Sequence, residues 1–115
     1  MTATLALPEP LLLELAPGRL SVGDLTIAID SRRVSVGARR VDLAPKEYEL
    51  LVALAAAPER VFRKSELLRV VWGYHASSRT RTVDAHACRL RRKLAGDGPP
   101  RYVRNVWGYG YRLID

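Results

Sequence analysis

The 115-residue sequence has a single cysteine, Cys88, and few long apolar runs. One cysteine is inconsistent with an intrachain disulfide framework or a multi-cysteine zinc site, and it fits a reducing cytosol, so we expect a cytoplasmic protein. The longest clear apolar run, Leu50 to Ala57, is far shorter than the roughly 18 to 20 residues that cross a bilayer. Two glutamates precede the first basic residue, Arg19, which is the wrong charge order for a signal peptide. We therefore expect neither a secreted nor a membrane-spanning protein.

Acidic residues are scarce in the second half of the chain. Residues 1–57 carry six basic and seven acidic residues, whereas residues 58–115 carry thirteen basic and five acidic ones. Between Arg79 and Lys93, six basic residues accompany one acid, Asp84. This asymmetry indicates a polyanionic partner, either nucleic acid or an anionic membrane surface, and the alternative is a basic face that only serves solubility.

The first 18 residues differ from the rest of the sequence. They contain Pro8, Pro10 and Pro17, a density that opposes regular structure, so we expect a tail or linker over residues 1–18 and one domain over residues 19–115. Short β-like runs separated by glycine and aspartate turns follow, and their short connections predict an antiparallel meander. These runs are Leu20–Val22, Leu25–Ile29, Arg33–Val36 and Arg39–Leu43.

Three helices and a hairpin are predicted next. The first helix begins at Pro45 and ends before Pro58, with an apolar face that we assign to Tyr48, Leu51, Val52 and Ala55. The second covers Lys64 to Trp72, and the third covers about Arg81 to Ala95. Two strands, Tyr102–Val106 and Tyr111–Ile114, are then joined by a turn in which Gly108 and Gly110 allow positive φ. The expected class is α+β.

The third predicted helix has two different faces when its residues are placed at about 100° intervals. One narrow apolar stripe consists of Val83, Ala87, Leu90 and Leu94. The opposite face consists of Arg81, Ala85, Cys88, Arg89 and Arg92. A helix anchored by the stripe would present arginines, largely without acidic partners, to the major groove of DNA, where Arg reads guanine and small apolar side chains meet thymine methyls. Residues at the borders, namely Thr82, His86, Arg91 and Lys93, would lie nearer the phosphates.

Catalytic and metal sites are not predicted. Asp84, His86 and Cys88 are two residues apart on the third helix, so neighbouring members point in opposite directions and cannot share a ligand. Gly108 and Gly110 belong to a hairpin and do not open a helix, which excludes a phosphate-binding glycine loop. We therefore expect no enzymatic activity and no cofactor. For Trp72 and Tyr111 we expect a buried ring with an outward polar tip, and for Trp107 and Tyr109 exposure at the turn.

From Leu20 to Ile114 the sequence resembles the OmpR/PhoB family of winged-helix effector domains of bacterial response regulators. The resemblance rests on several stretches that occur in the same order as in the family. They are Leu43–Leu51, Arg60–Phe62, Leu67–Gly73, Arg81–His86 with Arg89–Arg91, and Val103–Arg112. It implies a winged helix-turn-helix fold, with an N-terminal four-stranded antiparallel sheet, three helices and a C-terminal β-hairpin wing.

The resemblance also implies a site and partners. The third helix would enter the major groove of double-stranded DNA with Ala85 and Arg89 at the bases, and the wing would touch the adjacent minor groove or its backbone. Contacts to phosphates would come from Trp72, Arg81, Thr82, His86, Arg91 and Arg92, and wing contacts from Asn105, Trp107, Tyr111 and Arg112. Cys88 stands where many relatives carry arginine, and Ala44 and Arg63 replace the usual Ser/Thr helix caps.

Two further interactions are implied by the same resemblance. Family activators contact RNA polymerase through the loop that corresponds to Gly73–Thr80, here with Tyr74, His75, Ala76, Ser77, Ser78 and Arg79. Many members bind direct-repeat half-sites as head-to-tail pairs. The prediction is a sequence-specific DNA-binding transcription regulator. One alternative is a protein-interaction winged helix that uses residues 73–80 and Leu11–Leu13. Another is a protein that binds anionic membranes, but the third helix lacks the apolar face that inserts into a membrane surface.

Overall fold

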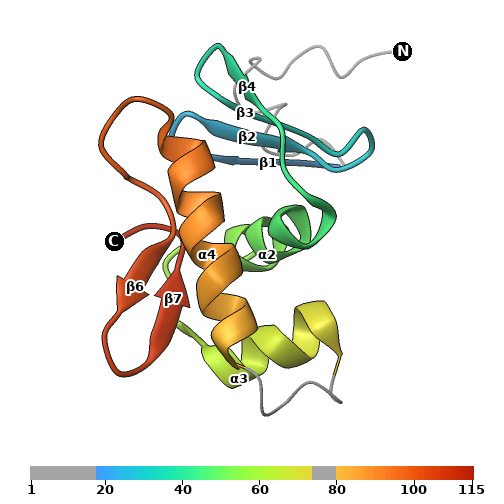
Figure 1. The fold of residues 1–115 in the computed structure, drawn as a ribbon. Coiled ribbons are helices and arrows are strands. Elements are labelled where there is room, and N and C mark those ends of the chain that lie inside the picture. The colour runs from blue at the N-terminus through green and yellow to red at the C-terminus, as the bar shows by residue number, and fades with distance from the viewer. Residues whose placement is uncertain (1–17, 74–79) are drawn as a thin grey trace. The chain divides into compact units, whose positions relative to one another are not determined.

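The computed structural model describes residues 18–73 and 80–115, so the tail or linker expected over residues 1–18 lies almost wholly outside the described residues. The chain forms two compact units, one up to Arg40 and one from Val41 onward. Four strands come first, helices follow, and a hairpin comes last (Figure 1). This order confirms the predicted α+β class and winged-helix architecture. Within the described residues, no helix is both long and apolar enough to span a membrane.

The N-terminal sheet has the strand order β1-β2-β3-β4. Its strands are β1 (Arg19–Val22), β2 (Leu25–Ala28), β3 (Arg33–Val36) and β4 (Arg39–Val41). β2 is antiparallel to both β1 and β3, as the meander predicted. Leu25, Ile27, Val34 and Val36 are buried, because alternate residues of a strand point to the same face of the sheet.

The second unit begins with α2 (Pro45–Ala55), which starts at the proline that the sequence indicated. Three residues of the predicted apolar face, Tyr48, Leu51 and Ala55, are buried, but the prediction was wrong for Val52. Val52 is only partly buried, whereas Leu50, Leu54 and the carboxylate-bearing Glu47 are buried. The buried face is therefore wider than the predicted stripe and includes one carboxylate.

The second predicted helix is two short helical segments. α3 (Lys64–Leu67) is one α-helical turn, and η2 (Leu68–Trp72) continues it as a π-helical turn. The next helix, α4 (Thr80–Ala95), begins one residue before the predicted start. In Figure 1, α4 lies between α2 and the terminal hairpin, with α3 near its N-terminal end.

The hairpin strands β6 (Arg104–Val106) and β7 (Gly110–Arg112) are shorter than predicted. The sequence did not predict β5 (Phe62–Arg63), which pairs with β7 and makes a three-stranded sheet of order β5-β7-β6. Gly108 has the expected positive φ of 82°. The expectation for Gly110 was wrong: it is buried within β7, and a Cβ there would collide with the Phe62 carbonyl. Its role is close backbone approach.

Candidate nucleic-acid interface

The α4 helix is anchored by one face and exposed on the other. Its buried residues are Val83, Ala87, Leu90 and Leu94, the stripe that the sequence predicted. The residues predicted for the opposite face are all exposed, namely Arg81, Ala85, Cys88, Arg89 and Arg92. Burying an aliphatic side chain contributes about 1.5–3 kcal/mol, so the stripe fixes which way the basic face points.

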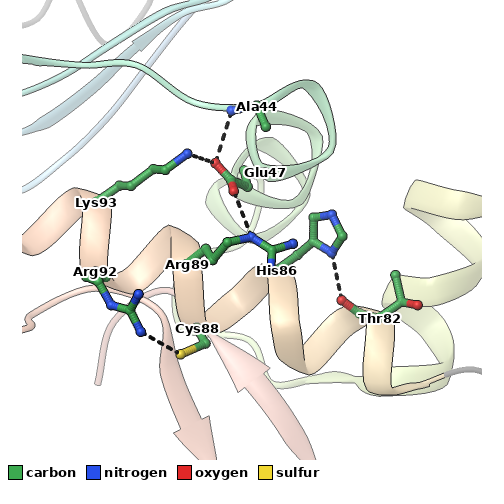
Figure 2. Close-up of polar contacts among 8 residues, drawn as sticks. All are labelled: Ala44, Glu47, Thr82, His86, Cys88, Arg89, Arg92 and Lys93. Atoms are coloured by element: carbon green, nitrogen blue, oxygen red, sulfur yellow. Dashed lines mark hydrogen bonds and ion pairs between the residues drawn. The ribbon is translucent and has the colours of Figure 1, made fainter.

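A buried carboxylate on α2 holds two cations of α4 (Figure 2). The Glu47 side chain is only 2% exposed, and its Oε1 accepts a hydrogen bond from Lys93 Nζ at 2.6 Å. Its Oε2 accepts one from Arg89 Nε at 3.3 Å. The prediction that the basic face largely lacks acidic partners is therefore wrong for Arg89. The two partners are 42 positions apart in the sequence, so helical periodicity could not indicate their proximity.

The same carboxylate also serves the start of α2. Glu47 Oε1 accepts a hydrogen bond from the Ala44 backbone N–H at 3.0 Å. Ala44 itself makes no side-chain cap, so Glu47 supplies half of a capping box. Burial alone would raise the pKa of Glu47, but hydrogen bonds from Lys93, Ala44 and Arg89 lower it below its ordinary value. Glu47 is therefore an ionised link between α2 and α4.

The ion pair restricts Arg89 without removing it from the surface. The Arg89 side chain is 47% exposed, and the bond to Glu47 uses Nε, at the stem side of the guanidinium. The two Nη groups, at its outer end, are the donors with the fork geometry that reads guanine. Glu47 thus limits the orientations that this fork can take.

Thr82, His86 and Trp72 lie together at the N-terminal half of α4. His86 Nδ1 is 2.8 Å from the Thr82 carbonyl oxygen, so Nδ1 carries the hydrogen and donates it. The Trp72 ring meets the His86 ring edge-on, with centroids 4.9 Å apart. All three side chains are partly buried, and the contact brings together residues that the resemblance placed at phosphates.

Arg91 binds the chain that leads into the hairpin. Its Nε donates a hydrogen bond to the Val103 carbonyl at 2.8 Å, and the Val103 N–H donates to the Leu113 carbonyl at 2.9 Å. Val103 is fully buried with a φ of 64°, a left-handed conformation that β-branched residues rarely adopt. Arg91 therefore has a structural role that the helical wheel did not indicate. Arg92 is exposed, with Nη2 3.6 Å from Cys88 Sγ.

The hairpin exposes two aromatic rings. Trp107 is 92% exposed and Tyr109 is 63% exposed, which confirms the expectation for both. Asn105 is exposed, whereas Arg112 is partly buried, with Nη2 3.8 Å from Asp115 Oδ1.

Tyr111 differs from its prediction. Its ring is buried as expected, but its hydroxyl donates to Asp84 Oδ1 at 2.6 Å instead of pointing outward. Lys64 Nζ also lies 3.0 Å from that oxygen. Burial and the Asp84 carboxylate raise the pKa of Tyr111. Burial alone would raise the pKa of Asp84, but bonds from Tyr111 and Lys64 lower it. This network joins α3, α4 and β7.

Two remaining predictions concern the loop and metal binding. Residues Tyr74 to Arg79, which were assigned to RNA polymerase contact, lie outside the described residues. Among residues 18–73 and 80–115, no cluster of three or more His, Cys, Asp or Glu side chains could hold a metal ion. Within that part of the chain, the arrangement offers cations, hydrogen-bond donors and exposed aromatic rings on α4 and the hairpin.

Comparison with known proteins gives consistent matches. A family model described as "Transcriptional regulatory protein, C terminal" matches residues 38–113. The transcriptional regulatory protein SrrA of Staphylococcus aureus is 43% identical over 91 residues, which are 77% of this chain and 38% of SrrA. The RstA DNA-binding domain of Klebsiella pneumoniae, solved in complex with the RstA box, has a TM-score of 0.75 at 29% identity, covering 84% of this chain and 96% of that one.

The response regulator DrrB of Thermotoga maritima, an OmpR/PhoB homologue, has a TM-score of 0.74 at 31% identity, covering 85% of this chain and 45% of DrrB. The chain thus spans less than half the length of SrrA and of DrrB, but nearly all of the RstA DNA-binding domain. The likeness is to one domain of longer regulators. The chain belongs to the family of transcriptional regulatory protein C-terminal domains, the OmpR/PhoB type of winged-helix effector domain.

Proposed function

We propose that residues 19–115 form a sequence-specific, double-stranded DNA-binding domain of a transcription regulator. In this proposal α4 enters the major groove, and the hairpin of β6 and β7 lies against the adjacent minor groove or backbone. The observation that carries it is the arrangement of α4, which is anchored by a fully apolar face and exposes Arg81, Arg89 and Arg92 on the other. The family and the likeness to the RstA DNA-binding domain support it.

The contacts that we propose follow from exposure and from the bonds already made. Ala85 and Arg89 would face bases, with the Arg89 fork aligned by Glu47. Arg81, Arg92, Thr82, His86 and Trp72 would approach phosphates, as would the Nη groups of Arg91. On the hairpin, Asn105, Trp107 and Arg112 would contribute. Tyr111 would act indirectly, by holding Asp84, and Cys88 would lie at the groove without adding a charge.

Wider partners are also proposed, on the support of the family resemblance. Pairs of the domain would bind direct-repeat half-sites head to tail, and residues 73–80 would contact RNA polymerase. A DNA-binding role would place the protein in the cytoplasm, on the nucleoid when bound. A non-enzymatic role, without a cofactor, agrees with the family. A protein-interaction winged helix remains the alternative function, and it predicts no binding to duplex DNA.

The experiment begins with selection of bound duplexes from a random pool, which supplies a preferred site. Affinities of the wild-type protein for this site and for a random duplex are then measured at several salt concentrations. We expect log affinity to fall linearly with log salt, because each phosphate contact releases counterions, by a slope of about 0.9 per contact. No enrichment from the pool, together with no salt dependence, would overturn the proposal and favour the protein-interaction alternative.

Variants separate the proposed roles. Arg89→Ala should cost about 1–3 kcal/mol on the preferred site and relax the preference at one base, whereas Arg92→Ala should weaken both duplexes equally and reduce the salt slope by about 1. Trp107→Ala should weaken binding while leaving the thermal midpoint unchanged, since the ring is 92% exposed. Arg39→Ala, at an exposed arginine of the other unit, is the matched control and should leave base preference unchanged. Equal weakening of both duplexes by Arg89→Ala would contradict a base-reading role.

A further inference from the structure

The N-terminal sheet carries a cationic surface of its own, formed by residues of the first unit. The register of β1, β2 and β3 places side chains directly opposite one another on the face of the sheet that Leu25 and Ile27 do not occupy. These side chains form two cross-strand rows, one with two arginines around an alanine and one of hydroxyl groups. The first row is Arg19, Ala28 and Arg33, and the second row is Ser21, Thr26 and Ser35. We call this surface the arginine–hydroxyl face.

A hollow of about 320 Å³ opens on the arginine–hydroxyl face. Its lining includes Arg19, Thr26, Ala28, Arg33, Ser35 and Arg40, all from the first compact unit. Neighbouring strands lie about 4.8 Å apart, so the Cα atoms of Arg19 and Arg33 are separated by about 10 Å, with Ala28 between them. Because the alanine side chain is small, it leaves space between the two long, exposed arginine side chains.

The chemistry of this hollow indicates its ligand. Guanidinium groups bind carboxylates through two parallel hydrogen bonds, and the Thr26 and Ser35 hydroxyls add neutral donors. The methyl groups of Ala28 and Thr26 make part of the floor apolar. A glutamate or aspartate side chain, with a methylene stem and a planar anionic head that can pair with a guanidinium, matches this mixture.

The spacing fits an extended acidic segment. Alternate residues of a strand point to one side, about 6.8 Å apart, so two carboxylates of such a segment come within reach of two flexible arginines on β1 and β3. The first unit also has an excess of cations in its described part, with five arginines against two aspartates between Gly18 and Arg40. We propose that the arginine–hydroxyl face is a docking site for an acidic segment of a partner protein.

The test uses the full chain, 15N labelled, and acetylated hexaglutamate as the probe. Amide shifts are followed in the wild-type protein and in two charge-matched double variants, R19Q/R33Q on the sheet and R81Q/R92Q on α4. We expect hexaglutamate to shift amides of β1 to β3 in the wild type and in R81Q/R92Q. In R19Q/R33Q, the affinity at these amides should fall at least tenfold. S35E keeps both arginines and adds a negative charge to the lining of the hollow, so it should also weaken the binding of hexaglutamate.

DNA binding gives the opposite pattern if the proposal holds. Affinity for a random duplex should fall in R81Q/R92Q and stay within about twofold of wild type in R19Q/R33Q. Peptide-induced shifts confined to α4, or unchanged peptide affinity in both R19Q/R33Q and S35E, would overturn the proposal. An equal loss of duplex affinity in the two double variants would also overturn it, because the face would then bind nucleic acid.

Discussion

Replacing Glu47 by glutamine tests whether one buried carboxylate fixes α4 on the rest of its unit. The substitution keeps the size of the side chain and an oxygen that can accept the Ala44 N–H. It removes the charge that holds Lys93 at 2.6 Å and Arg89 at 3.3 Å. The two half-exposed cations then remain beside a neutral, buried group.

The expected loss of stability follows from the geometry. A hydrogen bond to a charged group contributes about 1.5–3 kcal/mol, and breaking a fully buried ion pair costs about 3–5 kcal/mol. Here the cations are 47% and 40% exposed, so water compensates part of the loss. We expect Glu47→Gln to lower the free energy of unfolding by about 2 kcal/mol, which for a domain of this size is about 6–12 °C in Tm.

The difference between wild type and variant should depend on pH. The pKa of Glu47 lies below its ordinary value of 4.5 in the folded protein, so its ionised form contributes stability above that value. This contribution disappears as the pH falls below about 4.5 and through the folded pKa. The stability gap between the two proteins should therefore be constant near neutral pH and narrow as the pH falls below about 4.5.

Urea unfolding at several pH values measures both effects. The control is Glu49→Gln on the same helix, where the ion pair with Lys46 is 40% and 42% exposed and exposed pairs contribute at most about 1 kcal/mol. If Glu47→Gln and Glu49→Gln shift the midpoint equally, or if the gap stays constant with pH, the role assigned to Glu47 is wrong.

Three other substitutions test the hairpin and its attachment. Tyr111→Phe removes the bond to Asp84 and should cost about 1–2 kcal/mol, seen in thermal unfolding; an unchanged midpoint would mean that the hydroxyl bond adds nothing. Gly110→Ala drives a methyl group into the Phe62 carbonyl and should cost more than 3 kcal/mol, of the order seen for severe overpacking. Gly108→Ala, at positive φ but with open space around it, should cost only about 1 kcal/mol, so equal losses at both glycines would contradict the assignment of close approach to Gly110.

Local patterns predicted the parts of the fold that depend on local chemistry. The apolar stripe of α4 was predicted residue by residue, because the spacing of Val83, Ala87, Leu90 and Leu94 fits only one face of a helix. The start of α2 at Pro45 was predicted for a similar reason. Leu25 and Ile27 alternate with Thr26 and Ala28 in the sequence, which is the period of a half-buried strand, and both are buried.

The parts that were missed depend on contacts between distant residues. Two residues, Phe62 and Arg63, carry too little pattern to indicate the strand β5, which forms only because β7 lies beside it. The partners of Arg89 and Tyr111 were missed because Glu47 and Asp84 look like ordinary surface acids in the sequence. A glutamate inside an apolar helix, three residues after an alanine cap, was the one available signal for the first of these links.

The conformation of Val103 has a consequence for the energetics of DNA association. A non-glycine residue in the left-handed region stores strain of the order of 1–3 kcal/mol, and it persists here because both peptide groups are bonded, one to Arg91 and one to Leu113. These two hydrogen bonds hold the connection from α4 to the hairpin in one conformation in the protein without DNA. The wing should therefore meet DNA preorganised, which lowers the conformational entropy that complex formation must remove at this connection.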